Sequence, residues 1–475
     1  MLQSRCAFLA LCLAAAACSG CGTGSEAPDA GSPGADAGPP DSGLPDSGLP
    51  DAGAPDAGAP DAGSPDAGLP DAGAALESGA LLGGPGPAPG YYAGVRFTSG
   101  TVTGLTDASG AFYYSAGAQV AFSVGGLAIG SVPGAPRITP FTLAGSCQAT
   151  PLLTFLLVFL QSLDQDHDPT NGIQLGPLPE TLAGQALASL SRMQLAQAIA
   201  QLSPGTAPVA DQDSLDRFIA QVDGEEWTQR SLDTFSLLSG GERSQGAASD
   251  GQSWFFSWRL GLQRTSFDYS LENQNLAAIP LDLGLQGSDH IGDIDVFDNT
   301  LYAGIEDSKH YAHPRIALYD THTLTLQTHY DLDATIQSEG VPWVAFDGPR
   351  QLVYSSLWDP SPGINQFDAL SKMAFVRTLA LSPAIGRIQG AKLYRGFLYA
   401  ATDRALKVIY KINLDTGTTL PVLAMDLGVE QEGLGFLERP DGTALHTLNV
   451  TKGTTGSELR HHQRTRAPLR DLLCP

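Results

Sequence analysis

The sequence predicts a mainly β protein, in which a small β-sandwich-like module and a short helical segment precede a C-terminal β-propeller. Three observations support this prediction. A glycine-led unit recurs five times after residue 235, short strand-like runs fill residues 91–145, and one apolar run of helical length follows them. We expect the propeller to occupy residues 235–475 with five blades, and six blades are the alternative.

The recurring unit consists of a polar residue, a glycine, a short apolar strand, a turn and a second strand. Its glycines are 46, 48, 50 and 43 residues apart, and they are Gly246, Gly292, Gly340, Gly390 and Gly433. Periods near 40–50 residues with several strands per repeat are typical of propeller blades. Runs between the units, such as IALYDTHTLTLQTHYDL, supply the expected outer strands.

A polar side chain precedes each repeated glycine by one or two positions. If every glycine marks the start of an innermost strand, these side chains form one ring at one mouth of the central channel; they are Gln245, His290, Glu339, Gln389 and Glu432. A ring with two carboxylates and an imidazole suits a cation or a polar ligand. Glu339 and Glu432 are also the candidate catalytic pair, since glycosidases use two carboxylates. Hydrogen bonding from blade to blade is the structural alternative.

Residues 91–145 contain short β-branched and aromatic runs bounded by Gly, Asp and Ser, such as GAFYYSAG and QVAFSVGG. Such runs predict strands and hairpins. The next segment, residues 146–230, opens with the apolar run PLLTFLLVFLQSL at residues 151–163. Because a span across a bilayer needs about 20 residues, this shorter run predicts a buried helix.

An acidic loop, LDQDHDPTNGI, follows this helix directly. Its aspartates alternate along the chain, so that several oxygens can point at one centre; the expected calcium ligands are Asp164, Asp166, Asp168 and Asn171. Oxygen-rich turns of this kind suit Ca²⁺. Pro169 and Leu175 stand where an EF-hand has its glycine and bidentate glutamate, so the loop is not an EF-hand. The pattern resembles loops that follow β modules in bacterial secreted proteins, and a solvated acidic turn is the alternative.

Residues 1–17 have the charged start, apolar run and small-residue end of an export signal. The AAAC segment that ends at Cys18 resembles the signal of bacterial lipoproteins, although that family prefers Leu at the first position. The resemblance implies a diacylglyceryl anchor on Cys18, with Cys21 as the alternative site. Ser19 then favours the outer membrane, on its periplasmic or extracellular face. An ordinary cleaved signal is the competing interpretation.

Residues 18–90 comprise the expected anchor and a tether built on the five-residue unit PDAGx. Such Pro- and Gly-rich sequence cannot bury a core and is expected to be disordered. No Lys or Arg occurs between Arg5 and Arg96, whereas this stretch holds Glu26, Glu77 and nine aspartates. The tether resembles those of outer-membrane lipoproteins from myxobacteria-like organisms, which implies that it displays the folded body away from a membrane.

The whole chain has 50 acidic and 26 basic residues and a formal charge of −24. This balance argues against nucleic acid, which basic residues must neutralise. It also argues against a basic patch for anionic lipid. Cys147 and Cys474 are the only cysteines of the expected folded body. In an oxidising compartment they are candidates for a disulfide, and two buried thiols are the alternative.

The expected function is therefore that of a lipid-anchored envelope or surface protein, whose propeller binds a protein or carbohydrate ligand. A surface hydrolase of glycosidase or phosphoesterase type, acting through the channel carboxylates, is one alternative. An envelope scaffold is another. Binding is favoured over catalysis because the sequence has no GxSxG, HExxH or GxxxxGK[ST] motif and no pair of CxxC motifs.

Overall fold

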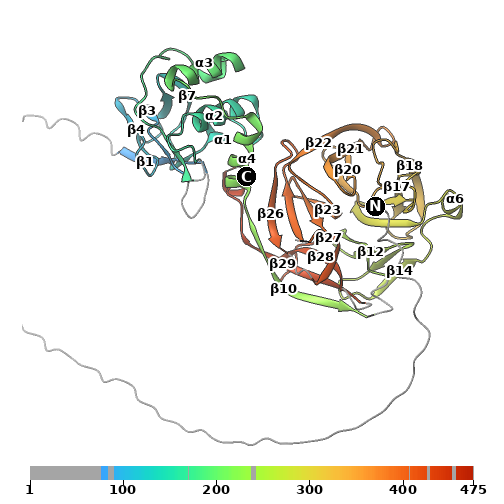
Figure 1. The fold of residues 1–475 in the computed structure, drawn as a ribbon. Helices are drawn as coiled ribbons and strands as arrows, with labels where there is room; N and C mark the ends of the chain where they lie inside the picture. The colour runs from blue at the N-terminus through green and yellow to red at the C-terminus, as the bar shows by residue number, and fades with distance from the viewer. Residues whose placement is uncertain are drawn as a thin grey trace, which may run out of the picture. The chain divides into compact units, whose positions relative to one another are not determined.

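The computed structural model describes residues 76–83, 90–168, 171–236, 242–405, 407–424, 428–451 and 456–473 (Figure 1). The expected signal, the lipidation candidates Cys18 and Cys21, and nearly all of the tether lie outside these residues, as does Cys474.

The N-terminal β module contains one four-stranded antiparallel sheet, in the order β4-β3-β6-β7, and a three-stranded sheet in the order β5-β1-β8. Alternate side chains of these strands are buried, and Phe97, Phe112 and Phe122 meet in the core. The strands are β1 (Leu76–Leu81), β2 (Tyr92–Ala93), β3 (Arg96–Ser99), β4 (Val102–Leu105), β5 (Ala111–Ser115), β6 (Gln119–Val124), β7 (Leu127–Pro133) and β8 (Arg137–Ile138).

Strand β1 lies in the range that the sequence analysis assigned to the tether. It pairs antiparallel with β5 and parallel with β8. Leu81 at its end is fully buried in the module core. The last PDAG unit lies just before this strand and a Gly- and Pro-rich stretch follows it, so the sequence analysis did not separate the strand from the tether. The folded module therefore begins before residue 90.

The helical segment follows the module. The predicted buried helix at 151–163 is observed as α2: its N-cap Thr150 accepts a hydrogen bond from Leu153 N, and Pro151 occupies the first turn. The elements of this segment are α1 (Pro140–Ala144), α2 (Pro151–Ser162), β9 (Ile173–Gln174), η2 (Leu187–Ser189), α3 (Arg192–Leu202) and α4 (Asp211–Asp223). Among the described helices, none has both the length and the apolar character of a membrane span.

The C-terminal half is propeller-like. Within residues 226–466, the described strands form five four-stranded antiparallel sheets: β11–β14, β15–β18, β19–β22, β23–β26 and a last sheet ordered β27-β28-β29-β10. The first strands of these sheets, β11, β15, β19, β23 and β27, contact one another in turn, and β27 contacts β11 again. The sheets are consequently arranged around a common centre, as Figure 1 shows.

The strands of the first three sheets are β11 (Gly246–Ser249), β12 (Trp254–Trp258), β13 (Gly261–Thr265), β14 (Leu271–Asn275), β15 (His290–Phe297), β16 (Thr300–Glu306), β17 (Arg315–Asp320), β18 (Leu326–Asp331), β19 (Ala345–Asp347), β20 (Leu352–Ser356), β21 (Ser361–Asp368) and β22 (Ala374–Ile385). Those of the last two sheets are β23 (Ile388–Tyr394), β24 (Phe397–Thr402), β25 (Val408–Ile412), β26 (Thr419–Ala424), β27 (Val429–Phe436), β28 (Thr443–Thr451), β29 (Ser457–Arg466) and β10 (Glu226–Phe235). Helix α6 (Leu281–Leu285) precedes β15, and α7 (Arg470–Leu473) follows β29.

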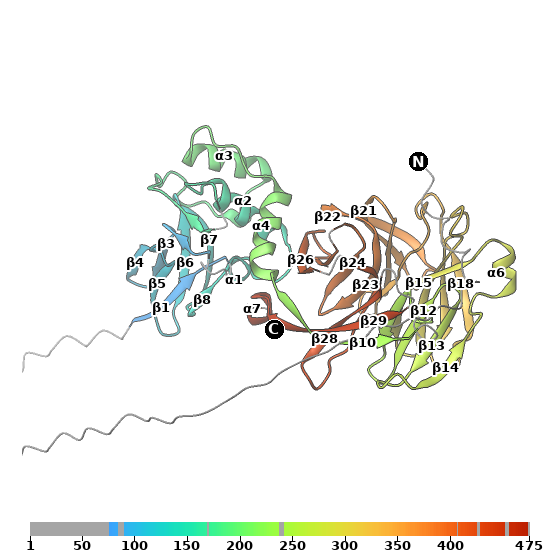
Figure 2. The ribbon, with the colours of Figure 1, turned by 60° about the horizontal axis from the view of Figure 1, so that its bottom comes forward.

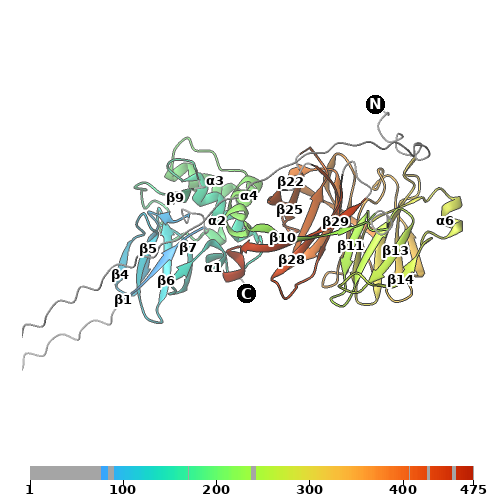
Figure 3. The same ribbon diagram turned by 90° about the horizontal axis from the view of Figure 1, so that it is seen from below.

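The outermost strand of the last sheet comes from the other end of the domain. Strand β10 pairs antiparallel with β29 from Glu226↔Arg466 to Phe235↔Ser457, and Figures 2 and 3 show the two side by side. The domain therefore begins at residue 226, nine residues before the expected boundary. The sequence gives no local sign of this pairing, because the two strands are more than 220 residues apart.

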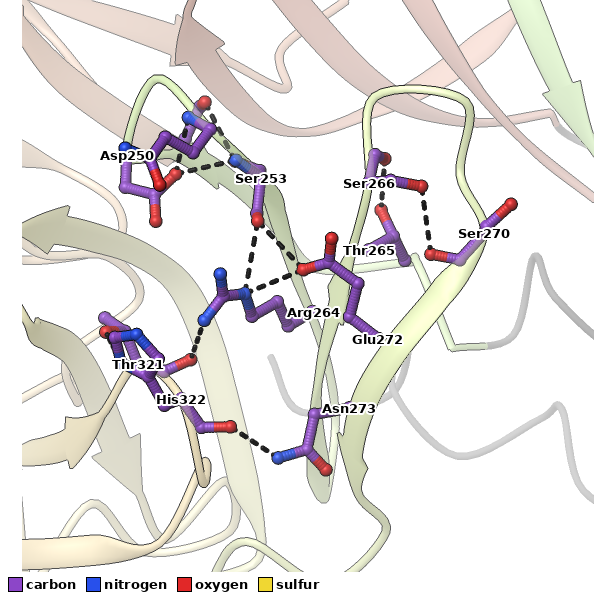
Figure 4. Close-up of polar contacts among 12 residues, drawn as sticks. Asp250, Ser253, Arg264, Thr265, Ser266, Ser270, Glu272, Asn273, Thr321 and His322 are labelled. Atoms are coloured by element: carbon purple, nitrogen blue, oxygen red, sulfur yellow. Dashed lines mark hydrogen bonds and ion pairs between the residues drawn. The ribbon is translucent and has the colours of Figure 1, made fainter.

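Neighbouring sheets are joined by apolar side chains inside and by polar contacts near the rim. Phe255 of β12 and Ile305 of β16, for example, belong to one buried cluster. Figure 4 shows polar contacts within the first sheet and from this sheet to the second. Arg264 on β13 bonds Glu272 at 2.8 Å and the carbonyl oxygen of Thr321 at 3.4 Å. Asn273 donates to the carbonyl oxygen of His322 at 2.5 Å.

Candidate functional site

The repeated glycines meet at the centre of the ring of sheets. A Cβ atom added to Gly246, Gly390 or Gly433 would lie 2.6–2.8 Å from a carboxylate oxygen of Asp293. Such an atom on Gly433 would also lie 2.9 Å from the Cα of Gly246. Real Cβ atoms do not approach other atoms this closely, so these positions require glycine. The glycine period in the sequence therefore reflects close approach of the inner strands.

Asp293 on β15 joins three sheets at this centre. Its carboxylate is fully buried, lies 2.5 Å from Lys392 Nζ of β23, and accepts hydrogen bonds from the backbone N–H groups of Ala247 and Ala391 at 3.2 Å. Burial raises the pKa of Asp293 to about 7, and Lys392 opposes this shift. Because β15 also contacts β23 and β27 across the centre, the channel is closed at this level.

The third unit departs from the glycine register. Gly340 has φ +83° and lies before β19, where an added Cβ would overlap a carboxylate oxygen of Glu306. The position beside Asp293 is instead taken by Trp343, whose backbone forms an isolated parallel bridge with Asp293. Trp343 is fully buried and its indole N–H donates to Ser356 Oγ at 3.0 Å, so it fills space between sheets.

We use the term mouth for the end of the ring at which β11, β15, β23 and β27 begin. Two of the predicted ring residues touch there: His290 Nε2 lies 2.6 Å from Gln245 Oε1. The other ring nitrogen, Nδ1, lies 3.0 Å from Glu306 Oε1, and Glu306 Oε2 accepts from Val341 N at 2.9 Å. A polar chain thus links the first, second and third sheets, which agrees with the structural alternative for these residues.

Glu339 lies in the loop before β19, six residues ahead of that strand. Its Oε2 accepts a hydrogen bond from Asp359 N at 2.8 Å, and the Asp359 carboxylate pairs with Arg404 at 2.7 Å. Glu339 therefore contacts the loop between β20 and β21. Gln389 lies within β23 and is half-buried.

Glu432 on β27 is only 6% exposed. Burial raises its pKa well above the usual value, and Glu430 and Asp403 add to this while Lys407 opposes it. Asp403 forms a buried ion pair with Lys407 and also accepts from Gln431 N at 3.2 Å. The mouth thus holds three carboxyl groups close together, of which Glu432 is the one whose environment favours the neutral form.

An arginine and a tryptophan border this acidic group. Arg387 Nη2 lies 3.5 Å from Asp403 Oδ2, and its guanidinium carbon lies 5.5 Å from the centre of the Trp358 ring. Arg387 N also donates to the Trp358 carbonyl oxygen at 2.6 Å. Both side chains are partly exposed, so an aromatic ring and a cation face solvent beside the buried carboxyl groups.

The two candidate catalytic carboxylates have different surroundings. Glu432 is buried in the carboxyl group just described, whereas Glu339 is half-exposed and its oxygen is held by a backbone N–H. The closed centre at Asp293 lies below the mouth. The two carboxyl groups therefore do not share the matched surroundings of a glycosidase pair that faces one bond.

In the predicted calcium loop, Asp166, Asp168 and Asn171 are linked by hydrogen bonds, whereas Asp164 is buried. Asp164 is 1% exposed, and its Oδ1 accepts a hydrogen bond from Gln174 N at 2.8 Å. Its Oδ2 is buried and has no hydrogen-bond partner among the described residues. Burial raises its pKa to about 6. Asp166 accepts from Asn171 Nδ2 at 2.8 Å and from Asp168 N at 3.0 Å. Across the described part of the chain, no three Asp, Glu, His or Cys side chains gather in a metal-binding arrangement.

Cys147 is disulfide-bonded. The guanidinium of Arg470, four residues before Cys474 in the sequence, donates to the carbonyl oxygen of Cys147 and pairs with both oxygens of Asp223. These contacts bring the C-terminal helix α7 to the loop that holds Cys147. Cys474 itself lies outside the described residues, so its pairing with Cys147 stays a prediction.

Sequence reasoning missed two buried ion pairs. One lies at the centre, below the mouth, and the other at the mouth itself; they are Asp293–Lys392 and Asp403–Lys407. Asp293 directly follows a repeated glycine, and Lys392 follows Gly390 by two positions. A charged residue one or two positions after a repeated glycine was therefore the pattern in the sequence that could have predicted the central pair. The mouth residues Asp403 and Lys407 lie in a loop between second and third strands, which the glycine period does not mark.

No model of a known protein family matches the chain, and no curated protein matches it either. Among solved structures, glutaminyl cyclase from Myxococcus xanthus covers 52% of this chain and 99% of its own, with a TM-score of 0.38 and 9% identity. Hydrazine synthase from Kuenenia stuttgartiensis covers 45% of this chain and 57% of its own, with a TM-score of 0.30 and 12% identity. A chain of a mitotic checkpoint complex covers 45% and 60%, with a TM-score of 0.28 and 9% identity. At these values, what those proteins bind or catalyse does not extend to this chain.

Proposed function

We propose that this chain is a lipid-anchored surface protein whose C-terminal domain, a closed five-bladed propeller, binds a polar ligand of carbohydrate type at its mouth. The observation that carries the binding proposal is the mouth itself, where Trp358 and Arg387 lie beside the group of Asp403, Glu430 and Glu432. An aromatic face next to polar hydrogen-bonding groups suits a sugar ring. A carboxyl group with a strongly raised pKa is also common at functional sites.

Five blades are supported by five four-stranded sheets whose first strands contact one another in a circle. Closure is supported by β10, which supplies the outer strand of the sheet that begins with β27. A propeller presents its loops at the mouth on a rigid frame, which suits recognition.

Binding is favoured over hydrolysis because the two candidate carboxylates have different exposures and partners. A retaining or inverting glycosidase needs two carboxyl groups that face one bond. Here Glu339 is turned to Asp359 N, while Glu432 is buried beside Asp403.

The test is binding of the full chain to a glycan array, together with variants Arg387→Ala and Glu432→Gln. We expect the wild-type chain to retain particular glycans and both variants to lose at least tenfold in affinity. Glu180→Gln is the matched control, because this exposed acid pairs with Arg96 in the N-terminal module. Equal retention by all four proteins contradicts the mouth as the site. Turnover of nitrophenyl glycosides or phosphates that Glu339→Gln abolishes supports the hydrolase instead.

We also propose that the loop at Asp164, Asp166, Asp168 and Asn171 binds Ca²⁺ weakly. Its support is the buried Asp164 Oδ2, which has no hydrogen-bond partner in the described part of the chain; a nearby cation would favour the ionised form of this carboxyl group. Calorimetry with CaCl₂ should show millimolar binding that Asp166→Ala abolishes. Heat that is absent in the wild type, or unchanged in the variant, removes this proposal.

The anchor and location are proposals that rest on the sequence alone. Labelling with a radioactive fatty acid in the producing bacterium should mark the chain, and Cys18→Ser should abolish the label. Retained label in that variant and its loss in Cys21→Ser would move the anchor to Cys21.

A further inference from the structure

A cleft lies at the opposite ends of the strands that form the mouth, between the sheet β23–β26 and the sheet that contains β10. Its volume is about 230 Å³. The residues that line it include Trp227, Tyr394, Arg395, Arg439, Gln463 and Arg464. The cleft thus collects three arginines and two aromatic rings in a chain whose formal charge is −24.

Two of the three arginines already hold carboxylates of the chain. Arg395 lies 3.1 Å from Glu438 Oε1, and Arg464 lies 2.9 Å from Asp471 Oδ2. Asp471, on α7, also lies 3.6 Å from Arg395. These pairs leave little charge on Arg395 and Arg464 for a ligand, and they fix both side chains in place.

Arg439 is different. Its one ion pair among the described residues is a long contact of 3.9 Å between Nε and Asp441 Oδ2. The other oxygen of Asp441, Oδ1, accepts from both the backbone N and the Oγ1 of Thr443, at 2.9 and 2.6 Å. The Asp441 carboxylate is therefore held by its own turn, and the Arg439 guanidinium keeps most of its hydrogen-bonding capacity.

The neighbouring amide also presents a donor. Gln463 Oε1 accepts from Arg230 Nε at 2.8 Å, which leaves its Nε2 group to point the other way. The donors of the two rings are already used: Trp227 Nε1 donates to buried Glu225 at 2.9 Å, and Tyr394 Oη donates to Glu438, which also lines the cleft, at 3.0 Å. Among the described residues, the donors of the cleft that remain for a ligand are those of Arg439 and Gln463, and they suit an anion.

The aromatic wall is rigid. Tyr394 stacks on Phe436 with ring centres 4.2 Å apart and parallel planes, and Trp227 meets both rings edge-on at 6.3 and 6.1 Å. The guanidinium carbon of Arg395 also lies 5.1 Å from the centre of the Tyr394 ring. Rings packed in this way keep a fixed position, so that a ligand contacts them without loss of side-chain freedom. A planar guanidinium such as that of Arg439 recognises a carboxylate through two parallel hydrogen bonds.

We propose that this cleft binds a small carboxylate ligand with a single ring, such as a uronic acid or an aromatic monocarboxylate. The carboxylate pairs with Arg439 and Gln463 Nε2, and the ring lies against Tyr394 and Trp227. The volume of the cleft limits the ligand to about one ring. This site is independent of the mouth and of the function proposed for it.

Titration of the full chain with glucuronate, benzoate and inorganic phosphate, followed by calorimetry and by saturation-transfer NMR, tests this site. We expect glucuronate or benzoate to bind, with affinity reduced at least tenfold in Arg439→Gln and lowered by added salt. Arg377→Gln is the control, because Arg377 on β22 is exposed and, like Arg230, donates to a glutamine at 3.1 Å.

A second variant, Gln463→Met, keeps the size of the side chain and removes only the proposed amide donor. It should weaken binding less than Arg439→Gln. Equal affinity in the wild type and Arg439→Gln overturns the proposal, as does the absence of binding by either carboxylate at millimolar concentration. Binding of phosphate without either carboxylate overturns the ligand class.

Discussion

The two ends of the last two sheets differ in the charge that they present. At the mouth, Asp403, Glu430 and Glu432 are gathered where β24 ends and β27 begins, and Lys407 and Arg387 are their cations. At the other end of the same strands, three arginines line a cleft. Asp403 and Glu432 are buried at the mouth, whereas the arginines of the cleft are partly exposed.

This difference shows that the repeated arrangement of strands does not determine which charged side chains lie at each end of the sheets. The inner strands approach each other through glycine at one level, around Asp293. Side chains beyond that level, at either end, are free to vary from sheet to sheet. The glycines and Asp293 are therefore needed for the fold, whereas ligand binding depends on the side chains at the two ends.

The largest expected effect comes from breaking the centre that separates the two ends. Asp293→Ala leaves Lys392 buried without its partner and removes acceptors from two backbone N–H groups. Loss of one member of a buried pair costs about 3–5 kcal/mol of unfolding free energy. Denaturant unfolding monitored by tryptophan fluorescence measures this loss. The double variant Asp293→Asn, Lys392→Met should lose less, and an unchanged midpoint for Asp293→Ala would refute the central role.

A smaller effect is expected when a single methyl group is forced into that centre. In Gly433→Ala the new Cβ meets Asp293 Oδ1 at 2.8 Å and Gly246 Cα at 2.9 Å. Overpacking of this kind costs about 1–3 kcal/mol. The control is Gly284→Ala in α6, where no atom lies within 4 Å of the added Cβ. Thermal unfolding that affects both variants alike would show that crowding is not the reason for glycine at 433.

The smallest effect concerns the pH dependence of stability at the mouth. The pKa of Glu432 is higher in the folded chain than in the unfolded chain, where it is near 4.5. The protonated group therefore stabilises the fold fully below the unfolded pKa, and this stabilisation is lost as pH rises toward the folded pKa. Over that window the wild type should lose up to about 1.4 kcal/mol of unfolding free energy per pH unit from this group. Glu432→Gln cannot ionise and should lose correspondingly less. Parallel pH profiles for the two proteins would place Glu432 in an ordinary solvated environment.

The sequence predicted the general fold because the glycine spacing has a physical cause. Close packing at Asp293 requires glycine in the first, fourth and fifth sheets, and Gly292 stands next to Asp293 in the second. The third sheet uses Trp343 at this place, while Gly340 serves a turn with positive φ. A spacing rule cannot distinguish a glycine needed for contact from a glycine needed for a turn.

The predicted ring was brought together only in part, for a related reason. Gln245 and His290 touch because both lie at the starts of neighbouring inner strands. Glu339 belongs to a loop that contacts Asp359 instead, since its sheet begins later in the unit. Which polar side chains turn inward depends on bulges, such as the one between Gln431 and Leu434, that no periodicity reveals.

The strand that closes the last sheet has a practical consequence for anyone who shortens this chain. A fragment that starts at Gly246 keeps three strands of that sheet, with β29 as its outer strand in place of β10. It also loses Trp227 and Phe235, which pack in two apolar clusters with residues of the sheets on either side. Apolar surface uncovered in this way favours association with another copy. Such a fragment should therefore self-associate, whereas one that retains residues 226–235 should stay monomeric.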